Sequence, residues 1–544
     1  MIKSLHWDIT RNCNLRCKHC YNAEKYFDTL SSSYISEEMD LEQCLHTVKS
    51  FFDAGFGHIH FLGGEPLASP IIFDVIEYAK SLNMIISINS NACLLDSDMQ
   101  LKLIELGVDQ FAASLDGCTA LINDSIRGAG TYEKVVSNMS RLNLLKKQSN
   151  SSLQTALVFT LTKKNIDDLI LLPSIADKLG VDLIVLTTFI ESGQGQKNRE
   201  FFSISFDEVC DAIERMVSKE LKQFSIPIQI DMRPRFCQYL STFHDAPVIY
   251  NEKNSMCCAG EDVWYLEANG NVHPCLIFQL ESGKLALDNN IFIKEKINID
   301  KNKISEVKFS QYWKTFLDTK HNFDTAKIPT CIDCRYVNEC QPCFADYGDY
   351  TSPILECEWT KRKESFQFDV IANMRTNVVN GVQLNREDLT ISRNNEIILI
   401  IEGEMSVEIW DLIVGGDTAI AIYNRLFEAY EVNEETLKYD IVSFIFTLKN
   451  YGAIEFEENV KFKRKNDLVC EQIDDEVIIF DTENEQFYEF DGIGSFVWGL
   501  IDNIDLNTIS QKVCDEYDIE KETVFQDMNT FINELREKQL ITAL

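Results

Sequence analysis

The chain has 544 residues, 45% of them hydrophobic, with 18 cysteines and a formal net charge of −35. The chain is too long for a single hydrophobic core, so three or four domains are expected. Because the sequence has no apolar run near ~20 residues and no signal-peptide core, we expect a cytoplasmic protein that does not enter a membrane. From residue 385 onward there are 36 acidic and 13 basic side chains, and such a surface would repel nucleic acid, which excludes it as a partner.

Short apolar strands alternate with amphipathic helices from residue 4 to about residue 232. This alternation predicts a parallel α/β sheet with right-handed crossovers. Six strand–helix units would make a partial (β/α)6 barrel, with chemistry on the loops that leave the carboxyl ends of the strands. The six predicted strands lie within SLHWDIT, HIHFLGG, MIISINS, VDQFAASLDG, LQTALVFTLT and VDLIVLTTF.

Three thiols, Cys13, Cys17 and Cys20, fall within eight positions of the loop after the first strand, in DITRNCNLRCKHCYN. A tetrahedral zinc site needs four ligands, commonly in two separated pairs. A C-x3-C-x2-C triplet without an obvious fourth ligand instead suits a [4Fe–4S] cluster bound at three corners. One iron is then left for an outside ligand.

The motif CNLRCKHC, followed by FLGGEP, resembles the radical S-adenosylmethionine superfamily over residues 1–232. The resemblance implies that the three thiolates hold a [4Fe–4S] cluster and that the amino and carboxylate groups of S-adenosylmethionine chelate its fourth iron. It also implies reductive cleavage of S-adenosylmethionine to a 5′-deoxyadenosyl radical, which abstracts hydrogen from the substrate.

The loops after the later strands resemble the cofactor contacts of the same superfamily. Because glycines permit close backbone approach and a carboxylate can pair with an ammonium group, the GGEP segment is expected to meet the methionine ammonium. The segments INSNA, SLDG and IRGAGTYE resemble the later contacts, although their residues could equally be ordinary turn or cap residues. The cofactor-binding candidates are Gly63, Gly64, Glu65, Pro66, Asn91, Ser114, Asp116 and Arg127.

Cysteines crowd the next region, residues 233–370, where the strand–helix alternation stops. A C-x11-G-x4-C pattern is followed by a C-x2-C-x5-C-x2-C run and a final cysteine. This series of cysteines resembles the SPASM domain. The resemblance implies two auxiliary [4Fe–4S] clusters, and therefore three clusters in the whole chain. A zinc ribbon built from the four-cysteine run is the alternative. By this resemblance the outer cluster takes Cys331, Cys334, Cys340 and Cys357, and the inner cluster takes Cys258, Cys275 and Cys343.

Two departures from the SPASM pattern concern the inner cluster. Two residues, rather than the usual three, precede the last cysteine of the run, Cys343. The inner cluster also lacks an obvious fourth ligand; Cys257 and Cys237 are candidates, and an open iron could instead accept a substrate thiolate. The other cysteines are expected to be small buried hydrophobic residues: Cys44, Cys93, Cys118, Cys210, Cys470 and Cys514.

Two similar blocks make up the C-terminal region: a first copy at residues 385–465 and a second copy at residues 466–544. Trp410 and Trp498 are 88 positions apart, and three other pairs keep an offset of 87, which indicates duplication. Each copy is predicted as a strand or hairpin followed by three helices. The first has only NEIILIIEG before its helix, whereas the second has the hairpin EVIIFDTENEQFYEF. The other pairs are Tyr430 and Tyr517, Leu448 and Leu535, and Ile454 and Ile541.

The second copy resembles the peptide chaperone of pyrroloquinoline quinone biosynthesis (PqqD), also called a RiPP recognition element, and the first resembles it more weakly. The resemblance implies two small winged-helix-like α+β domains, with a strand edge in the second that captures the leader of a precursor peptide. Trp410 and Trp498 are expected as core anchors. The acidic surface suits a partner with basic residues, although it could equally serve solubility alone.

Together the resemblances imply a radical S-adenosylmethionine enzyme that matures a ribosomally made precursor peptide. We expect a net oxidation that forms a thioether or C–C crosslink, with the second electron leaving through the auxiliary clusters. An electron donor such as flavodoxin or ferredoxin is expected as a partner. A peptide epimerase, a splicease, an anaerobic sulfatase maturase and a non-catalytic leader-binding scaffold are the alternatives; Leu276 stands where sulfatase maturases have an aspartate. No catalytic acid or base is assigned.

Overall fold

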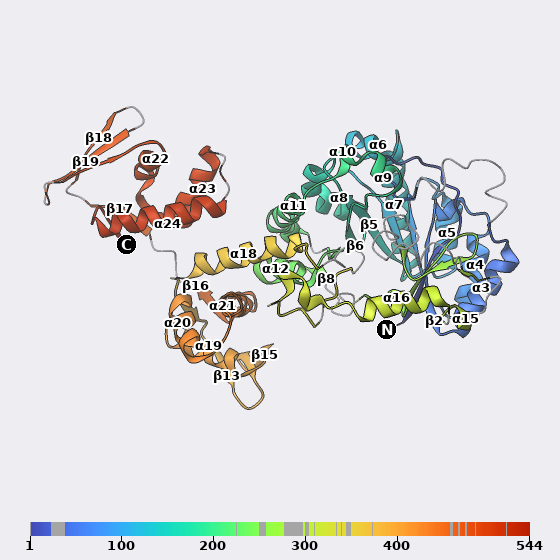
Figure 1. Ribbon diagram of the computed structural model, residues 1–544. Coiled ribbons are helices and arrows are strands. Elements are labelled where there is room, and N and C mark those ends of the chain that lie inside the picture. Colours follow the sequence, from blue (N-terminus) through green and yellow to red (C-terminus); the bar gives the residue numbers. More distant parts are fainter. Residues whose placement is uncertain are drawn as a thin grey trace. The chain divides into compact units, whose positions relative to one another are not determined.

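The computed structural model divides the chain into two compact units, residues 1–362 (unit 1) and 363–544 (unit 2) (Figure 1). The residues that it describes are 2–22, 38–224, 226–249, 257–276, 297–299, 304–308, 310–332, 334–338, 340–343, 350–372, 374–456, 461–465, 468–473, 476–482, 484, 486–517, 519 and 521–543.

Unit 1 is built on one sheet, which has eleven strands among the described residues, in the order β11-β10-β9-β1-β2-β3-β4-β5-β6-β7-β8. Strands β9 and β1 to β8 run parallel, whereas β10 and β11 are antiparallel to their neighbours. The parallel α/β fold predicted from the sequence is confirmed. The strands are β1 (Lys3–Asp8), β2 (Phe56–Leu62), β3 (Ile85–Ser90), β4 (Gln110–Ser114), β5 (Gln154–Leu161), β6 (Leu183–Thr188), β7 (Ile228–Ile230), β8 (Val248–Ile249), β9 (Val263–Leu266), β10 (Asn271–His273) and β11 (Ile297–Asn298).

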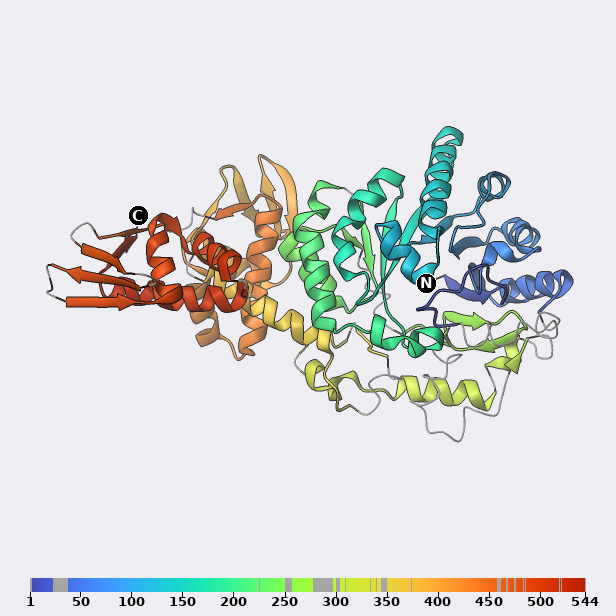
Figure 2. The same cartoon turned by 90° about the horizontal axis from the view of Figure 1, so that it is seen from above.

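The helices between these strands lie on the outer side of the sheet (Figures 1 and 2). The first of them, α3, shows why: Asp40 and Gln43 form a capping box at its start, and Val48 and Phe51 on one face are buried in the core of unit 1. These helices are α3 (Leu41–Asp53), η1 (Pro66–Ala68), α4 (Ile72–Ser81), α5 (Ser97–Glu105), α6 (Ala120–Arg127), α7 (Thr131–Ser149), η2 (Ile166–Leu171), α8 (Leu172–Leu179), α9 (Gly193–Lys197), α10 (Arg199–Phe202), α11 (Phe206–Lys219), η3 (Leu221–Gln223) and α12 (Pro234–His244).

The sheet continues past residue 232, into the cysteine-rich region where the sequence alternation stops. Trp264 of β9 packs against Trp313, with ring centroids 4.3 Å apart, and against Phe51 and Phe56. The cysteine-rich region therefore shares the core of the preceding parallel sheet. Its further helices are α15 (Ile304–Val307), α16 (Gln311–His321), η5 (Thr325–Lys327), η6 (Pro329–Cys331) and α18 (Leu355–Ile371).

Unit 2 contains the duplicated region. The first copy comprises β12 (Thr376–Val378), β13 (Val382–Asn385), β14 (Thr390–Arg393), β15 (Glu396–Ile400), α19 (Glu404–Val414), α20 (Ala419–Ala429), α21 (Glu434–Asn450) and β16 (Ile454–Phe456). The second copy comprises β17 (Lys461–Arg464), β18 (Leu468–Ile473), β19 (Glu476–Asp481), β20 (Gln486–Phe490), α22 (Gly492–Leu500), β21 (Asp502–Asp505), α23 (Leu506–Tyr517), α24 (Lys521–Glu537) and β22 (Ile541–Ala543).

The two copies share an element order. Each has a three-stranded antiparallel sheet, three long helices and a final strand that pairs back with a strand preceding the sheet: β16 with β12, and β22 with β17. The expectation that the first copy has only one strand before its helix is wrong, because β13, β14 and β15 form a complete sheet. The closing strands β12 and β17 begin before the predicted starts of the copies, residues 385 and 466.

Burial also matches between the copies. Trp410 and Trp498 are both buried, as expected of core anchors, while Tyr430 and Tyr517 are 40% and 39% exposed. Leu448 pairs with Leu535, and both are fully buried. Positions related by the offset of 87 or 88 residues thus have the same environment in both copies, which is what duplication of a folded unit produces.

Within the described part of the chain, no helix combines the length and the apolar character needed to span a membrane.

Candidate active site

The glycine loop after β2 packs directly on the backbone of the cysteine loop after β1. The amide of Gly64 donates to the Thr10 carbonyl (2.9 Å), and that of Glu65 donates to the Asn12 carbonyl (2.8 Å). A Cβ added to Gly63, whose φ is +129°, would lie 2.5 Å from the Thr10 oxygen, and one on Gly64 would lie 2.3 Å from the Asn12 oxygen. The two glycines are therefore needed where the two loops approach most closely.

The Glu65 carboxylate joins the loops after β2 and β3. It accepts hydrogen bonds from the Ser90 hydroxyl (2.6 Å) and from the amides of Leu67 (3.1 Å) and Asn91 (2.7 Å). Burial raises the pKa of Glu65, although these hydrogen bonds oppose the rise. A carboxylate has about four acceptor positions, so Glu65 keeps limited capacity for a ligand while it holds the loops together.

Asn91 extends this connection to the cysteine loop. Its side-chain amide donates to Oδ1 of Asn14 (2.8 Å), and its nitrogen lies 4.0 Å from the sulfur of Cys13. The structure thus brings Asn91, Glu65 and Cys13 into one neighbourhood, as the sequence pattern predicted.

A buried ion cluster holds the other side of the cysteine loop. Oδ2 of Asp116 lies 2.5 Å from Nε of Arg127 and 2.9 Å from Nε2 of His19, while Oδ1 accepts from the Thr160 amide (2.8 Å). Burial would raise the pKa of Asp116, but the positive charge of Arg127 and the contact with His19 outweigh it and lower that pKa. Asp116 is therefore a carboxylate that fixes both partners in place.

The cysteine loop also bonds to the end of α6. The amide of Lys18 donates to the Ile126 carbonyl (3.0 Å), and the sulfur of Cys17 lies 3.9 Å from the Arg127 carbonyl oxygen. Burial, with a contribution from Cys17, raises the pKa of Cys13 to about 11. Burial and the neighbouring thiols raise the pKa of Cys20 to about 12. Burial also raises the pKa of Cys17. Thiols whose ionisation burial disfavours suit a metal cluster, whose charge would stabilise the thiolates.

Two candidates have less specific surroundings. Pro66 is buried at the start of the short helix η1, a position that suits proline because the helix does not need its missing N–H. Ser114 is the half-buried last residue of β4. Their backbone roles account for these two positions.

A fourth loop, which the sequence prediction missed, also supports the cysteines. After β6, the amide of Gln194 donates to the Cys20 carbonyl (2.9 Å), and the Asn198 side chain donates to the Lys18 carbonyl (3.0 Å). A Cβ on Gly193, whose φ is +57°, would lie 2.5 Å from the Tyr21 oxygen. The glycine pair in SGQGQ, placed just after the sixth predicted strand, is the signal that could have identified this loop.

Polar atoms beside the cysteine loop fit a bound cofactor. Within the described residues, Nδ1 of His19 and both side-chain polar atoms of Asn22 are buried without a hydrogen-bond partner. Because buried polar groups are usually paired, these atoms are suited to hydrogen-bond a ligand in the same space. Together with the three thiols, they fit a cluster and a polar cofactor.

Three histidines occupy the inner face of β1 and β2. His6 and His60 are in register with ring centroids 5.1 Å apart, and both nitrogens of His58 lie 2.9 Å from the hydroxyls of Ser4 and Ser87. Burial lowers the pKa of His60 to about 4, and it also lowers those of His6 and His58. At neutral pH this face therefore carries neutral imidazoles.

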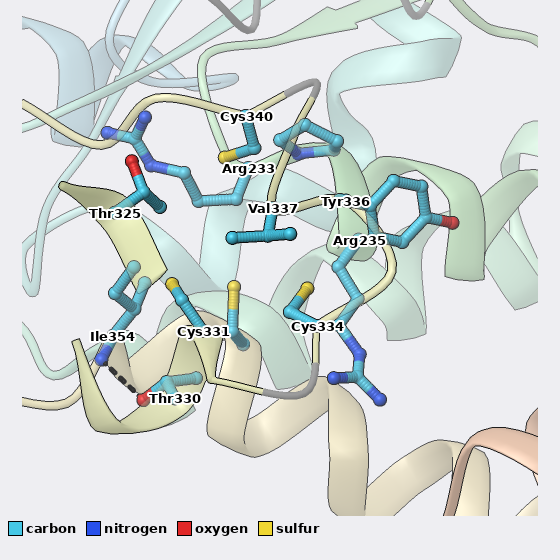
Figure 3. Close-up of a pocket in the computed structure, with 12 residues that line it drawn as sticks. Arg233, Arg235, Thr325, Thr330, Cys331, Cys334, Tyr336, Val337, Cys340 and Ile354 are labelled. Carbon is cyan, nitrogen blue, oxygen red and sulfur yellow. Dashed lines mark hydrogen bonds between the residues drawn. The ribbon is translucent and has the colours of Figure 1, made fainter. Parts of the chain in front are cut away.

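Four cysteines of the second cysteine region line one small cavity. Figure 3 shows the sulfur atoms of Cys331, Cys334 and Cys340 turned toward a shared space, with the Arg233 side chain beside Cys340. Arg233 hydrogen-bonds to Cys340, and its backbone amide donates to Glu356 (3.0 Å). The four residues predicted for the outer cluster, Cys331, Cys334, Cys340 and Cys357, are thus brought together.

A second cavity is lined by Cys257 and Cys258, and Cys340 borders it as well as the first. Cys257 and Cys275 both pack against the small apolar cluster of Ala259 and Phe316. Among the described residues, Cys275 and Cys343 line neither cavity. The structure thus groups Cys258 with Cys257 more clearly than it groups the predicted inner set.

Cys237 lies in a different environment from Cys257. It is buried in the main core of unit 1, and its sulfur lies 3.8 Å from the Met232 carbonyl oxygen. Cys44, Cys118 and Cys210 are buried, as expected. Cys93 and Cys514 are half-buried, and the expectation is wrong for Cys470, which is exposed because β18 is an outer strand of its sheet.

Both copies in unit 2 expose large apolar side chains on the last strand of their three-stranded sheet, which is an outer strand. Ile397 and Ile400 of β15 are 62% and 68% exposed, and Phe487 of β20 is 72% exposed. Each strand pairs on one side only among the described residues, with β14 or β19. An unpaired edge with apolar side chains is suited to accept an added strand.

Two family models match the chain. Residues 7–172 match the radical SAM superfamily, and residues 476–541 match coenzyme PQQ synthesis protein D (PqqD). The two matches lie in unit 1 and in the second copy of unit 2, respectively.

Similar proteins include a heme synthase and a mycofactocin maturase. The AdoMet-dependent heme synthase of Methanosarcina barkeri (strain Fusaro / DSM 804) is 21% identical over 66% of this chain and 97% of that protein. The mycofactocin maturase MftC of Mycobacterium tuberculosis is 23% identical over 50% of this chain and 63% of that protein.

Among solved structures, the fold is similar to that of SuiB from Streptococcus suis. Its complex with S-adenosylmethionine has a TM-score of 0.50 and 15% identity, covering 66% of this chain and 77% of SuiB. Its complex with precursor peptide SuiA has the same TM-score and identity, covering 65% of this chain and 74% of SuiB.

Proposed function

Because the chain joins a radical SAM domain to a C-terminal PqqD domain, we propose that it oxidatively modifies a ribosomally made precursor peptide. The observation that carries this proposal is the placement of Cys13, Cys17 and Cys20. Loops that follow β2, β3, β4 and β6 hold this cysteine loop at the carboxyl ends of the parallel strands, where α/β sheets of this kind place their chemistry.

In this proposal, Cys13, Cys17 and Cys20 hold a [4Fe–4S] cluster, with S-adenosylmethionine at the open iron. Once bound, these groups supply a one-electron oxidant able to remove hydrogen from the peptide. The residues of the chain hold that site rigid: Asp116 fixes Arg127 and His19 around the thiols, and Glu65 and Asn91 hold the loop from the opposite side. His19 and Asn22 offer polar atoms to the cofactor.

We further propose that the second cysteine region is a SPASM domain with two auxiliary [4Fe–4S] clusters. The cavity lined by Cys331, Cys334, Cys340 and Cys357 supports the outer set. For the inner set, Cys258, Cys275 and Cys343 remain the proposed ligands. Cys257 is favoured over Cys237 as the fourth, because Cys257 lines a cavity and Cys237 is packed in the core.

The proposed reaction removes two electrons from the peptide and forms a thioether or C–C crosslink. Epimerisation and backbone excision are the alternatives within the same class of substrate. A sulfatase maturase would not need unit 2, and Leu276 stands where that group has an aspartate. We propose a cytoplasmic setting with flavodoxin or ferredoxin as electron donor, because iron–sulfur ligation needs thiols kept reduced.

A tetrapyrrole substrate is the second candidate, and the 21% identity to a heme synthase favours it. The PqqD match at residues 476–541 favours a peptide instead. The exposed apolar edge of β20 in that copy supports leader binding, because added strands gain backbone hydrogen bonds and side-chain contacts at such edges.

The test is an anaerobic assay of the purified, iron-loaded chain with S-adenosylmethionine, a reductant and the peptide encoded beside its gene. We expect formation of 5′-deoxyadenosine and a peptide product lighter by two hydrogens. A variant with Cys13, Cys17 and Cys20 changed to alanine should lose both, whereas Cys470→Ala, which changes an exposed cysteine outside these sites, should retain them.

Three outcomes would contradict the proposal. If no condition yields 5′-deoxyadenosine, the chain is a leader-binding scaffold and not an enzyme. A product of unchanged mass with an inverted stereocentre identifies an epimerase. If the chain converts an iron-loaded tetrapyrrole and leaves the peptide unchanged, its substrate is a tetrapyrrole and not a peptide.

A further inference from the structure

The first copy of the duplicated region has kept the architecture of a peptide-binding domain, although the family model covers only the second copy. Its three-stranded sheet is complete, and its outer strand β15 has five residues, as does β20 in the second copy. A spacer between domains would need neither a complete sheet nor a free edge of matching length.

Strand β15 has the properties of an edge that awaits a partner. It pairs only with β14 among the described residues. Proteins usually protect such edges with lysine, proline, bulges or a covering segment. Strand β15, with the sequence EIILI, has one irregularity in its pairing but no lysine or proline. Ile397 and Ile400, 62% and 68% exposed, give the edge more apolar surface than an isolated sheet needs.

A register shift places these two side chains on the same face. Ile397 pairs with Ser392 and Ile400 pairs with Thr390, with an irregularity between Ile391 and Ser392. Because residues two apart on β14 share a face, Ile397 and Ile400 also share one. A peptide strand added beside β15 would find two apolar contacts there.

The opposite edge of this sheet is less suited to an apolar partner. Strand β13 has the sequence VQLN, in which the exposed positions are Gln383 and Asn385. The two edges of the first copy therefore differ, and the apolar edge is the one formed by β15. The second copy also exposes its Phe487 on that strand, β20.

Charge indicates the kind of peptide. Residues 376–456 contain 14 acidic and 5 basic side chains, and Glu396, Glu402 and Glu404 are exposed at the two ends of β15. An extended segment that alternates apolar and basic residues complements both the isoleucines and these carboxylates.

We propose that the β15 edge binds a second molecule of the precursor peptide, so that one chain captures two peptides. The inference rests on the proposed function, in which the second copy captures that peptide at β20. Both edges combine exposed apolar side chains with exposed carboxylates, Glu396 beside Ile397 and Glu489 beside Phe487, so both suit the same kind of segment. A leader that has one such segment per molecule would then fill the two edges with two molecules.

The test is calorimetric titration of the full-length chain with a 12-residue peptide selected on it from a displayed random library. We expect two peptides per chain. Ile400→Lys and Phe487→Lys should each reduce the stoichiometry from two to one, and the double variant should bind none. Both positions are well exposed, so circular dichroism should show an unchanged fold.

Matched controls place the same lysine on exposed apolar positions away from these edges. Val414→Lys on α19 and Val469→Lys on β18, at the opposite edge of its sheet, should leave two peptides bound. One peptide per chain, lost with Phe487→Lys and unaffected by Ile400→Lys, would overturn this inference and leave the proposed function standing. No binding at either edge would overturn leader capture as well.

Discussion

The two cysteine regions of unit 1 are held in place by different kinds of contact. The loop of Cys13, Cys17 and Cys20 is bonded to residues far away in the sequence, at positions 64–65, 126–127 and 194–198. Local bonds occur in both regions, as Cys20 bonds to Cys17 in the first. In the second, the amides of Cys334 and Cys340 have only such local bonds among the described residues, to Cys331 and Tyr336.

This difference indicates how each site is organised. The fold itself shapes the first loop, because four loops at the carboxyl ends of one sheet surround it. The second region depends on a few side-chain links, such as Thr330 to the Ile354 amide and Arg233 to Glu356. Metal binding often supplies folding free energy where the polypeptide supplies few contacts.

The largest effect is expected from removing iron with an anaerobic chelator. Hydrogen exchange in a peptide covering residues 331–343 should accelerate by more than tenfold, because its local bonds alone cannot hold the cysteines. Exchange in a peptide covering residues 8–22 should change much less. Equal loss of protection in both peptides would break the comparison.

Asp116→Asn should release the first loop without removing a cysteine. The change leaves Arg127 buried without its carboxylate, and breaking such a buried pair costs about 3–5 kcal/mol. We expect faster exchange in residues 8–22 and loss of the iron that we propose is bound there, measured as the iron-to-protein ratio. Asp98→Asn, the same change at an exposed position of α5, is the control. Unchanged protection in Asp116→Asn would show that the ion cluster does not hold the loop.

Gly64→Ala tests the contact between the glycine loop and the cysteine loop. The added methyl would lie 2.3 Å from the Asn12 oxygen and 2.6 Å from the Arg11 oxygen, and overpacking of this kind costs about 1–3 kcal/mol. Thermal unfolding should therefore begin at a lower temperature than in the unmodified chain. Gly499→Ala, whose methyl would meet open space in helix α22, should not lower the transition, because alanine is favoured over glycine in a helix. An equally undiminished transition in Gly64→Ala would contradict the close approach.

The smallest effect concerns the buried histidines. Because the pKa of His60 is about 4 in the folded chain and 6.5 ordinarily, protonation favours unfolding, so stability is present above pH 6.5 and is lost as the pH falls toward 4. Between pH 7.5 and pH 5, His60 should account for about 1–2 kcal/mol of lost stability. Hydrogen exchange of β2, corrected for its intrinsic pH dependence, measures this loss.

His60→Asn should reduce that pH dependence because it removes the titrating group. His46→Asn, which changes an exposed histidine of α3, should preserve it. An identical pH dependence in His60→Asn and the unmodified chain would show that other groups cause the acid sensitivity.

The sequence predicted the six strands β1 to β6 and their parallel order, because long apolar strands between amphipathic helices carry a strong periodic signal. It also predicted three of the four loops that meet at the cysteines, those after β2, β3 and β4, since the carboxyl ends of parallel strands lie at one edge; the loop after β6 was missed. The duplication and the burial of Trp410 and Trp498 followed from a constant offset and from residue type.

The tertiary structure alone decided the remaining features. Strands β7 to β11 have two to four residues, too few to show a period, and they form only because the existing sheet offers them an edge. The pairing of Asp116 with His19 joins residues that no local pattern relates. The complete sheet of the first copy was missed because its strands β13 and β14 have only four residues each. Local periodicity is readable along the chain, whereas these contacts exist only after distant segments have packed together.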